Sequence, residues 1–244
     1  MFLAEKEGRN MNPLTLKKYR RELRRFQDFC NRYGRHFLQE VGLPDLTEFC
    51  STWEQDYPST VTRQKVQERP RAFFKFGLNA DFIPKNPAAA MSSIKAQQSP
   101  TLPLEPDQYI ALLKAVPQVF TDPLKAARMH ALIRCMRRTG LFIGNAVCLE
   151  RTQIRQDVEK GMARIVTSRS RISAEVSVPI PPDVATELPA VAAANPQYVF
   201  WQTGSIQPEA ATKRWHKDLR ALFLKAGLPE GHPHQLRNTA AVSG

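Results

Sequence analysis

The chain of 244 residues is 42% hydrophobic and has 35 Lys and Arg against 23 Asp and Glu, a formal net charge of +12. That length and apolar content are sufficient for the cores of two modest domains. No apolar run is long enough to span a membrane, and the charged first residues do not resemble a signal peptide. Four cysteines without C-x-x-C spacing favour reduced packing residues over zinc ligands or disulfides, so the cytoplasm is the expected location.

The positive charge is shared evenly along the chain. Residues 1–100 hold 17 Lys and Arg against 11 Asp and Glu, and residues 101–244 hold 18 against 12, so each part carries +6. An excess spread in this way is expected of a protein that surrounds a polyanion, whereas a basic tail would concentrate it. The alternative interpretation is a basic soluble protein without such a partner.

The N-terminal part is predicted to consist of about four short helices. Apolar residues recur at three- and four-residue steps over 13–34, opposite a basic face, and Gly34 marks the end of that helix. Further helices are expected over 43–56 and 60–78. Pro70 is anomalous in the last one, because an interior proline costs about 3 kcal/mol. Either the helix is kinked there or the sequence has drifted without selection.

The basic faces of two of these helices are candidates for contact with nucleic acid. The alternative is that both faces are simply solvated. The candidate residues are Lys17, Lys18, Arg21, Arg63, Lys65, Arg69 and Lys75.

Residues 92–106 are polar and proline-rich, and they predict a semi-extended linker after a first domain at 1–91. The second domain, 107–244, is predicted to be mostly helical with a small antiparallel sheet, so the fold class is mainly α with an α+β second domain. Its strands are expected at 163–167 and 176–180, joined by a polar turn. Its helices are expected at 106–116, 123–139, 145–149, 182–192 and 208–226.

Three stretches resemble the tyrosine recombinase (phage integrase) family. Residues 234–239, His-Gln-Leu-Arg-Asn-Thr, are similar to its second box, His-x-Leu-Arg-His-Thr. Residues 136–150 resemble the first box, Thr-Gly-Leu-Arg-Ile-x-Asp/Glu-x-x-x-Leu, and residues 71–76 with 86–88 look like the close of the family's N-terminal domain. The stretches follow the family's order over nearly the whole chain. The resemblance implies a SAM-like helical core-binding domain followed by an integrase-like catalytic domain.

The resemblance also implies chemistry without a metal or cofactor. In the family a tyrosine attacks a DNA phosphodiester, and positive side chains neutralise the charge of the transition state. Matched residue by residue, His234 and Arg237 are the histidine and arginine of the second box. Residues three apart share a helix face, and an imidazole beside a guanidinium suits an oxyanion. Asn238 stands where the family often has a second histidine, and it donates a hydrogen bond but not a proton.

Other positions depart from the family's pattern. Phe142 stands where the first arginine is expected, and a phenyl ring donates nothing to a phosphate. Arg171, with Arg169 close by, aligns with the lysine of the family's hairpin to within two residues, and arginine is a poor general acid. No tyrosine follows Arg237 in the sequence, so the resemblance implies a truncated and degenerate member.

These features predict a DNA-binding protein related to enzymes of site-specific recombination and integration, but deficient in strand cleavage. Two alternatives stay open: an enzyme that is active only with a tyrosine supplied in trans, or a catalytically dead regulator that competes at recombination sites. The expected partners are double-stranded DNA and homo- or hetero-oligomers with full-length recombinases, and not a membrane. The expected location is the cytoplasm, in association with the nucleoid.

Overall fold

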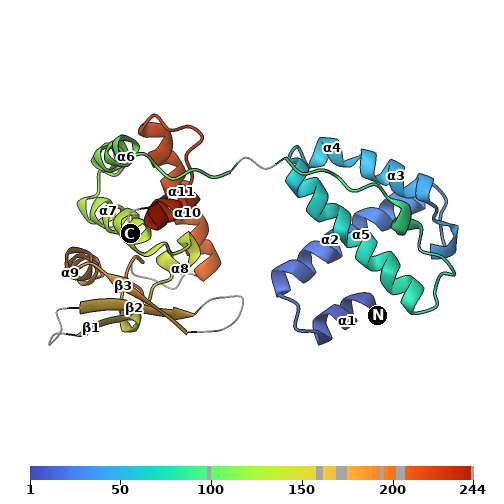
Figure 1. Cartoon of the computed structure of the whole chain (residues 1–244), viewed down its shortest axis with the longest axis horizontal. Coiled ribbons are helices and arrows are strands. Elements are labelled where there is room, and N and C mark those ends of the chain that lie inside the picture. Colours follow the sequence, from blue (N-terminus) through green and yellow to red (C-terminus); the bar gives the residue numbers. More distant parts are fainter. Residues whose placement is uncertain (98–99, 158–161, 169–174, 193–194, 202–206, 243–244) are drawn as a thin grey trace. The chain divides into compact units, whose positions relative to one another are not determined.

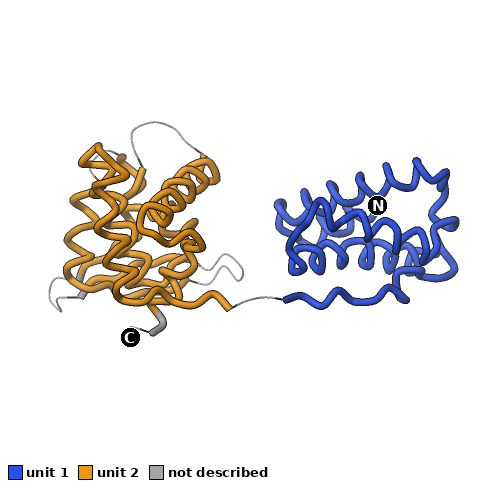
Figure 2. Tube along the Cα trace, turned by 90° about the horizontal axis from the view of Figure 1, so that it is seen from above, with its two compact units in different colours: residues 1–99 blue, residues 100–244 orange. Residues whose placement is uncertain are grey.

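The computed structural model describes residues 1–97, 100–157, 162–168, 175–192, 195–201 and 207–242. The chain divides into two compact units, 1–99 and 100–244 (Figure 2). Each unit has its own hydrophobic core. The boundary falls inside the proline-rich stretch 92–106. The residues before it bond to the first unit, where Gln67 donates to the carbonyl of Ser92 and accepts from the amide of Ile94.

The first unit is built from helices (Figure 1). They surround an aromatic core. Phe26, Phe49, Trp53 and Phe74 are buried in that core and pack edge to face with one another. The helices are α1 (Phe2–Gly8), α2 (Pro13–Arg32), α3 (Leu43–Ser51), α4 (Trp53–Asp56) and α5 (Thr60–Asn79), with 3-10 turns at Leu38–Glu40 and Pro87–Ala90.

Local sequence determines where α2 begins and ends. The side chain of Asn12 accepts a hydrogen bond from the amide of Leu14 at 2.9 Å, and Pro13 occupies the first turn. After Tyr33, Gly34 adopts φ +65°, a left-handed conformation that glycine enters without steric cost. The helix end predicted at Gly34 therefore follows from a backbone conformation that this residue supplies.

Helix α5 continues through Pro70, which is buried inside it. The proline removes one backbone hydrogen bond. Side chains on either side hold the helix to residues 91–94: Gln67 bonds to Ser92 and Ile94, and Arg71 donates to the carbonyl of Met91 at 2.7 Å. Tertiary contacts thus stabilise a helix that its own sequence disfavours.

The second unit combines helices with a small antiparallel sheet, which confirms the predicted fold class. The strands are β1 (Ile154–Asp157), β2 (Met162–Ser168) and β3 (Glu175–Ile180), ordered β1-β2-β3, with Ile165 paired to Ile154 and to Val178. The sequence did not indicate β1, which has Ile154 as its single β-branched residue. The helices are α6 (Pro106–Val119), α7 (Pro123–Thr139), α8 (Ile143–Val147), α9 (Pro182–Val191), α10 (Pro208–Lys225) and α11 (Pro233–Val242).

Helix α7 is the centre of the second unit, where it contacts α6, α8, α9 and α11 (Figure 1). Met129, Leu132, Ile133 and Met136 on this helix are fully buried. Gly140 ends the helix with φ +65°. None of the helices in the described ranges is both long and apolar enough to cross a membrane.

Candidate active site and nucleic-acid interface

The end of α7 and helix α11 bring three of the candidate residues together. The guanidinium carbon of Arg237 lies 3.6 Å from the centroid of the Phe142 ring. The imidazole of His234 meets the same ring edge-on, with 5.7 Å between the centroids. Residues from the two stretches that resemble the family's boxes, far apart in the sequence, therefore form one cluster, which we call the Phe142 cluster (Phe142, His234 and Arg237).

Close packing between α7 and α11 places this cluster. A Cβ on Gly140 would lie 3.6 Å from the Cβ of Ala240 and 3.9 Å from Cγ of Arg237, so the turn after α7 runs against α11. Leu236 is fully buried and anchors α11 in the core. Phe142 follows as the residue before α8, with its ring 46% exposed. The cluster is thus placed by packed helices and opens to solvent.

Arg237 is held by an aromatic ring and not by a carboxylate. Throughout the described residues, its guanidinium has no hydrogen-bond or ion-pair partner. A cation over an exposed ring gains about 0.5–1 kcal/mol, and the ring carries no charge that would cancel that of the arginine. The N–H groups of Arg237 therefore remain available to an anion.

The remaining candidates of the second unit lie elsewhere. Asn238 donates to the carbonyl of Thr101 at 2.7 Å, so its amide ties α11 to the start of this unit. Arg137, which is one turn before Phe142, lies over the ring of Tyr109 at 3.8 Å. Arg169 and Arg171 fall outside the described residues.

His232 joins the surroundings of the cluster, although the sequence did not single it out. Its ring meets that of His234 edge-on at 5.8 Å. Burial, and then the neighbouring His234, His216 and Arg220, lower the pKa of His232 from its usual value. The His-Pro-His pattern is the signal that would have indicated it. Within the described part of the chain, no group of three His, Cys, Asp or Glu residues is arranged to hold a metal ion.

In the first unit, α2 presents a basic surface to solvent. Lys17, Arg20, Arg21 and Arg24 recur at three- and four-residue steps and therefore share a face, with Lys18 beside them. These five residues line an open concavity together with Glu7 and Pro13. Apart from Arg21, none of the five has an ion-pair or hydrogen-bond partner among the residues that the structure describes. We call this surface the α2 basic face.

The candidates on α5 divide into outward and inward groups. Lys65 and Lys75 are exposed. Arg63 is 19% exposed and pairs with Glu54 at 2.7 Å. Arg69 is 12% exposed and lies 3.5 Å from a carboxylate oxygen of Glu22. Of these four candidates, Lys65 and Lys75 are the ones without an ion-pair partner among the residues that the structure describes, and they offer their charge to a ligand.

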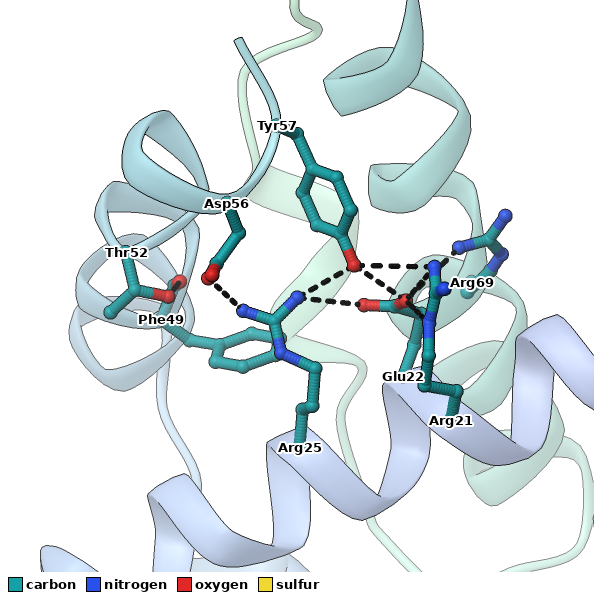
Figure 3. A network of polar contacts seen from close by, with 8 residues as sticks. All are labelled: Arg21, Glu22, Arg25, Phe49, Thr52, Asp56, Tyr57 and Arg69. Atoms are coloured by element: carbon teal, nitrogen blue, oxygen red, sulfur yellow. Dashed lines mark hydrogen bonds and ion pairs between the residues drawn. The ribbon is translucent and has the colours of Figure 1, made fainter. Parts of the chain in front are cut away.

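Glu22 organises a network that the sequence did not reveal (Figure 3). Its carboxylate, 2% exposed, accepts hydrogen bonds from Nε of Arg21 at 2.9 Å and from the hydroxyl of Tyr57 at 2.7 Å. Nη1 of Arg25 lies 3.4 Å from its second oxygen, and Arg25 also pairs with Asp56. We call these residues, with Arg69, the Glu22 network. In sequence, Glu22 is merely one acid in a basic helix.

Curated relatives of the chain are tyrosine recombinases. The chain is 28% identical over 243 residues to the tyrosine recombinase XerC of Rhodospirillum centenum, a match that covers 93% of this chain and 68% of the relative. It is 26% identical over 248 residues to XerC of a Roseiflexus species, covering 97% and 76%. It is 25% identical over 187 residues to XerD of Bradyrhizobium diazoefficiens, covering 73% and 56%. A scan against models of protein families finds no match.

Solved structures share the fold. A lambda integrase dimer bound to a COC′ core site superimposes with a TM-score of 0.74 at 14% identity, covering 99% of this chain and 87% of that one. The XerH recombinase bound to a palindromic difH substrate, in a post-cleavage complex, gives a TM-score of 0.74 at 18% identity, covering 97% and 70%.

Proposed function

We propose that this chain, which is similar to tyrosine recombinases, is a DNA-binding recombinase homologue whose Phe142 cluster holds a phosphate without supporting strand cleavage. The observation that carries the proposal is the contact of 3.6 Å between the guanidinium of Arg237 and the ring of Phe142. The residue that stands at the position of the family's first arginine therefore packs against the second arginine and adds no donor of its own.

The lost donor matters more for catalysis than for binding. Without a metal, the developing charge on the phosphorus of the transition state is neutralised by side-chain cations. An arginine that clamps a transferring phosphoryl group contributes about 10³–10⁵ in rate in other enzymes. Binding of a ground-state phosphate needs far less, and Arg237, whose N–H groups have no partner among the described residues, supplies a charge-assisted contact.

Charge on both units supports DNA as the ligand. Each half of the sequence carries +6, and the α2 basic face adds unpaired cations in the first unit. Contacts from lysine and arginine to phosphates supply most of the affinity of a protein for DNA of any sequence. Relatives of this fold include a lambda integrase dimer and the XerH recombinase, both bound to DNA.

A competitor at recombination sites is the second candidate function. Binding without cleavage would let the chain occupy DNA that an intact enzyme uses. Phe142 favours this role over activity that depends on a tyrosine supplied in trans, because a borrowed nucleophile would not replace the missing guanidinium.

The test combines binding and cleavage on one set of DNA molecules. The chain, its Phe142→Arg variant and the Rhodospirillum XerC are each mixed, in separate reactions, with a pool of nicked, labelled duplexes. XerC is the positive control. Gel shift reports binding, and a label that stays on the protein after denaturation reports a covalent adduct. We expect binding by both proteins and adducts only with XerC. Adducts formed by the unaltered chain would overturn the proposal that it is deficient in cleavage. The absence of a gel shift at low salt would overturn the proposal that it binds DNA.

A further inference from the structure

The three arginines around Glu22 differ in how far they reach solvent. The side chains of Arg25 and Arg69 are 29% and 12% exposed, and that of Arg21 is 59% exposed. Arg21 also belongs to the α2 basic face, where it lines the concavity with Lys17 and Arg24. Arg21 therefore connects the buried network to the open basic surface.

The guanidinium of Arg21 is fixed on one edge and free on the other. Nε and Nη2 each lie 2.9 Å from Oε1 of Glu22, and Nη2 is 3.4 Å from the hydroxyl of Tyr57. Nη1 has no partner in the described part of the chain. A planar guanidinium that is held along one edge presents its remaining donors in a fixed direction.

Tyr57 keeps the carboxylate in place. Its hydroxyl donates to Oε1 of Glu22 at 2.7 Å and accepts from Nη1 of Arg25 at 2.6 Å (Figure 3). Burial, and then the hydrogen bond to Glu22, raise the pKa of Tyr57 above its usual value of 10.0, so the hydroxyl keeps its proton. The carboxylate is thus fixed by a group that stays a donor at neutral pH.

We propose that Glu22 is a positioning residue that holds Arg21 on the α2 basic face in the orientation that binds a DNA phosphate. The inference rests on the proposed DNA binding and assigns a role to a carboxylate inside a surface for an anion. A free arginine side chain loses rotamer entropy when it binds a phosphate, and one that is already held loses less.

Simple electrostatics and the positioning role of Glu22 predict opposite changes in DNA affinity when the negative charge is removed. Removal of a negative charge near a DNA-binding face should strengthen binding, if charge alone matters. If Glu22 acts through Arg21, Glu22→Gln should weaken binding instead, although the net charge becomes more positive. Asp28 supplies the matched control, because it is an exposed carboxylate on the same helix.

The experiment measures affinity for a labelled duplex at several salt concentrations, with the full chain. We expect Glu22→Gln to bind about threefold to fivefold more weakly, the range that a partly exposed ion pair contributes. Its log–log salt slope should be shallower by up to about 0.9, one phosphate contact. Asp28→Asn should bind equally well or more tightly. Equal or tighter binding by a folded Glu22→Gln, with an unchanged slope, would overturn the proposal.

A double-mutant cycle separates positioning from a general structural effect. If Glu22 acts through Arg21, Glu22→Gln should add little to the loss caused by Arg21→Ala. Additive losses would show that Glu22 acts by another route and would overturn the assignment. Should Glu22→Gln fail to fold, Tyr57→Phe decides: it removes the fixing hydroxyl but no charge, and unchanged affinity in that folded variant would contradict the proposal.

The double variant Lys17→Ala, Arg24→Ala tests whether the α2 basic face binds DNA, separately from the positioning role of Glu22. Loss of affinity in this double variant supports the α2 basic face as a DNA surface, and the cycle above then tests Glu22 by itself. Unchanged affinity would remove the surface, and the positioning role with it.

Discussion

The Glu22 network and the Phe142 cluster hold arginines in two different ways. In the first unit, a carboxylate that is 2% exposed accepts from Arg21 and lies close to Arg25 and Arg69. In the second unit, Arg237 lies over the ring of Phe142 at 3.6 Å, and no carboxylate pairs with it among the described residues. A carboxylate gives firm placement but cancels charge, whereas an aromatic ring gives weaker placement and leaves the full charge available.

The difference bears on what each unit contributes to binding. The first unit has an ordered guanidinium together with unpaired lysines and arginines, which suits repeated contacts along a phosphate backbone. In the second unit, the Phe142 cluster has Arg237 and His234 around an exposed ring, which suits a single phosphate.

Salt should have the largest effect, because both regions are proposed to bind a polyanion. With about six phosphate contacts, the log–log slope of the binding constant is about −5, and affinity falls about a thousandfold between 50 and 200 mM salt. Fluorescence anisotropy with a labelled duplex measures the slope. A flat salt dependence would show that neither region contacts phosphates.

The second-largest difference between the two regions should be in the free energy of unfolding that each one contributes. Glu22→Ala leaves three arginines without their shared carboxylate, and we expect unfolding of the first unit to become easier by about 3 kcal/mol. Phe142→Ala removes a half-exposed ring and should cost the second unit much less. Hydrogen exchange of amides in α2 and in α7 follows each unit within the full chain. If the amides of α2 are protected as well in the Glu22→Ala variant as in the unaltered chain, the network's role in stability would be contradicted.

Binding by the Phe142 cluster should show a smaller effect. Phe142→Leu keeps an apolar side chain but removes the ring on which Arg237 lies, so affinity for a duplex should fall about twofold to fivefold. Leu124→Ala, another exposed apolar position of the second unit, is the matched control and should bind as the unaltered chain does. Stronger binding by Phe142→Leu would indicate that the ring withholds Arg237 from DNA.

The smallest expected effect is on pH dependence. The pKa of His232 is lowered in the folded chain, so the unfolded state takes up its proton first as the pH falls. The contribution of neutral His232 to stability is therefore complete above pH 6.5 and decreases below it. Thermal unfolding at pH 7.5 and 5.5 should show less loss for His232→Asn than for the unaltered chain. An equal loss in the two proteins would assign the pH dependence to other groups.

Sequence patterns predicted most of the helices and two of the three strands in the described residues, for identifiable reasons. The spacing of apolar residues indicated α2 and α7, and β-branched runs indicated β2 and β3, because these signals are local. Strand β1, with Ile154 as its one β-branched residue, gains its place from pairing with β2, which its own sequence does not encode.

The site shows the same division between local and tertiary information. The two boxes identified Phe142, His234 and Arg237, but the bond from Asn238 to Thr101 joins positions that no local pattern connects. The burial of Glu22 also depends on Tyr57, 35 residues further along the chain, and on Arg69 of another helix.

The hydrogen bonds between α11 and the start of the second unit affect the order in which the two units fold during synthesis. The amide of Leu104 donates to the hydroxyl of Thr239 across 135 residues, and Asn238 reaches Thr101 across 137. Contacts of such long separation close late, whereas the Glu22 network joins Arg21, Glu22, Tyr57 and Arg69 within the first unit and can form once that unit has left the ribosome. The nascent chain would therefore carry a folded α2 basic face while the Phe142 cluster is still unassembled.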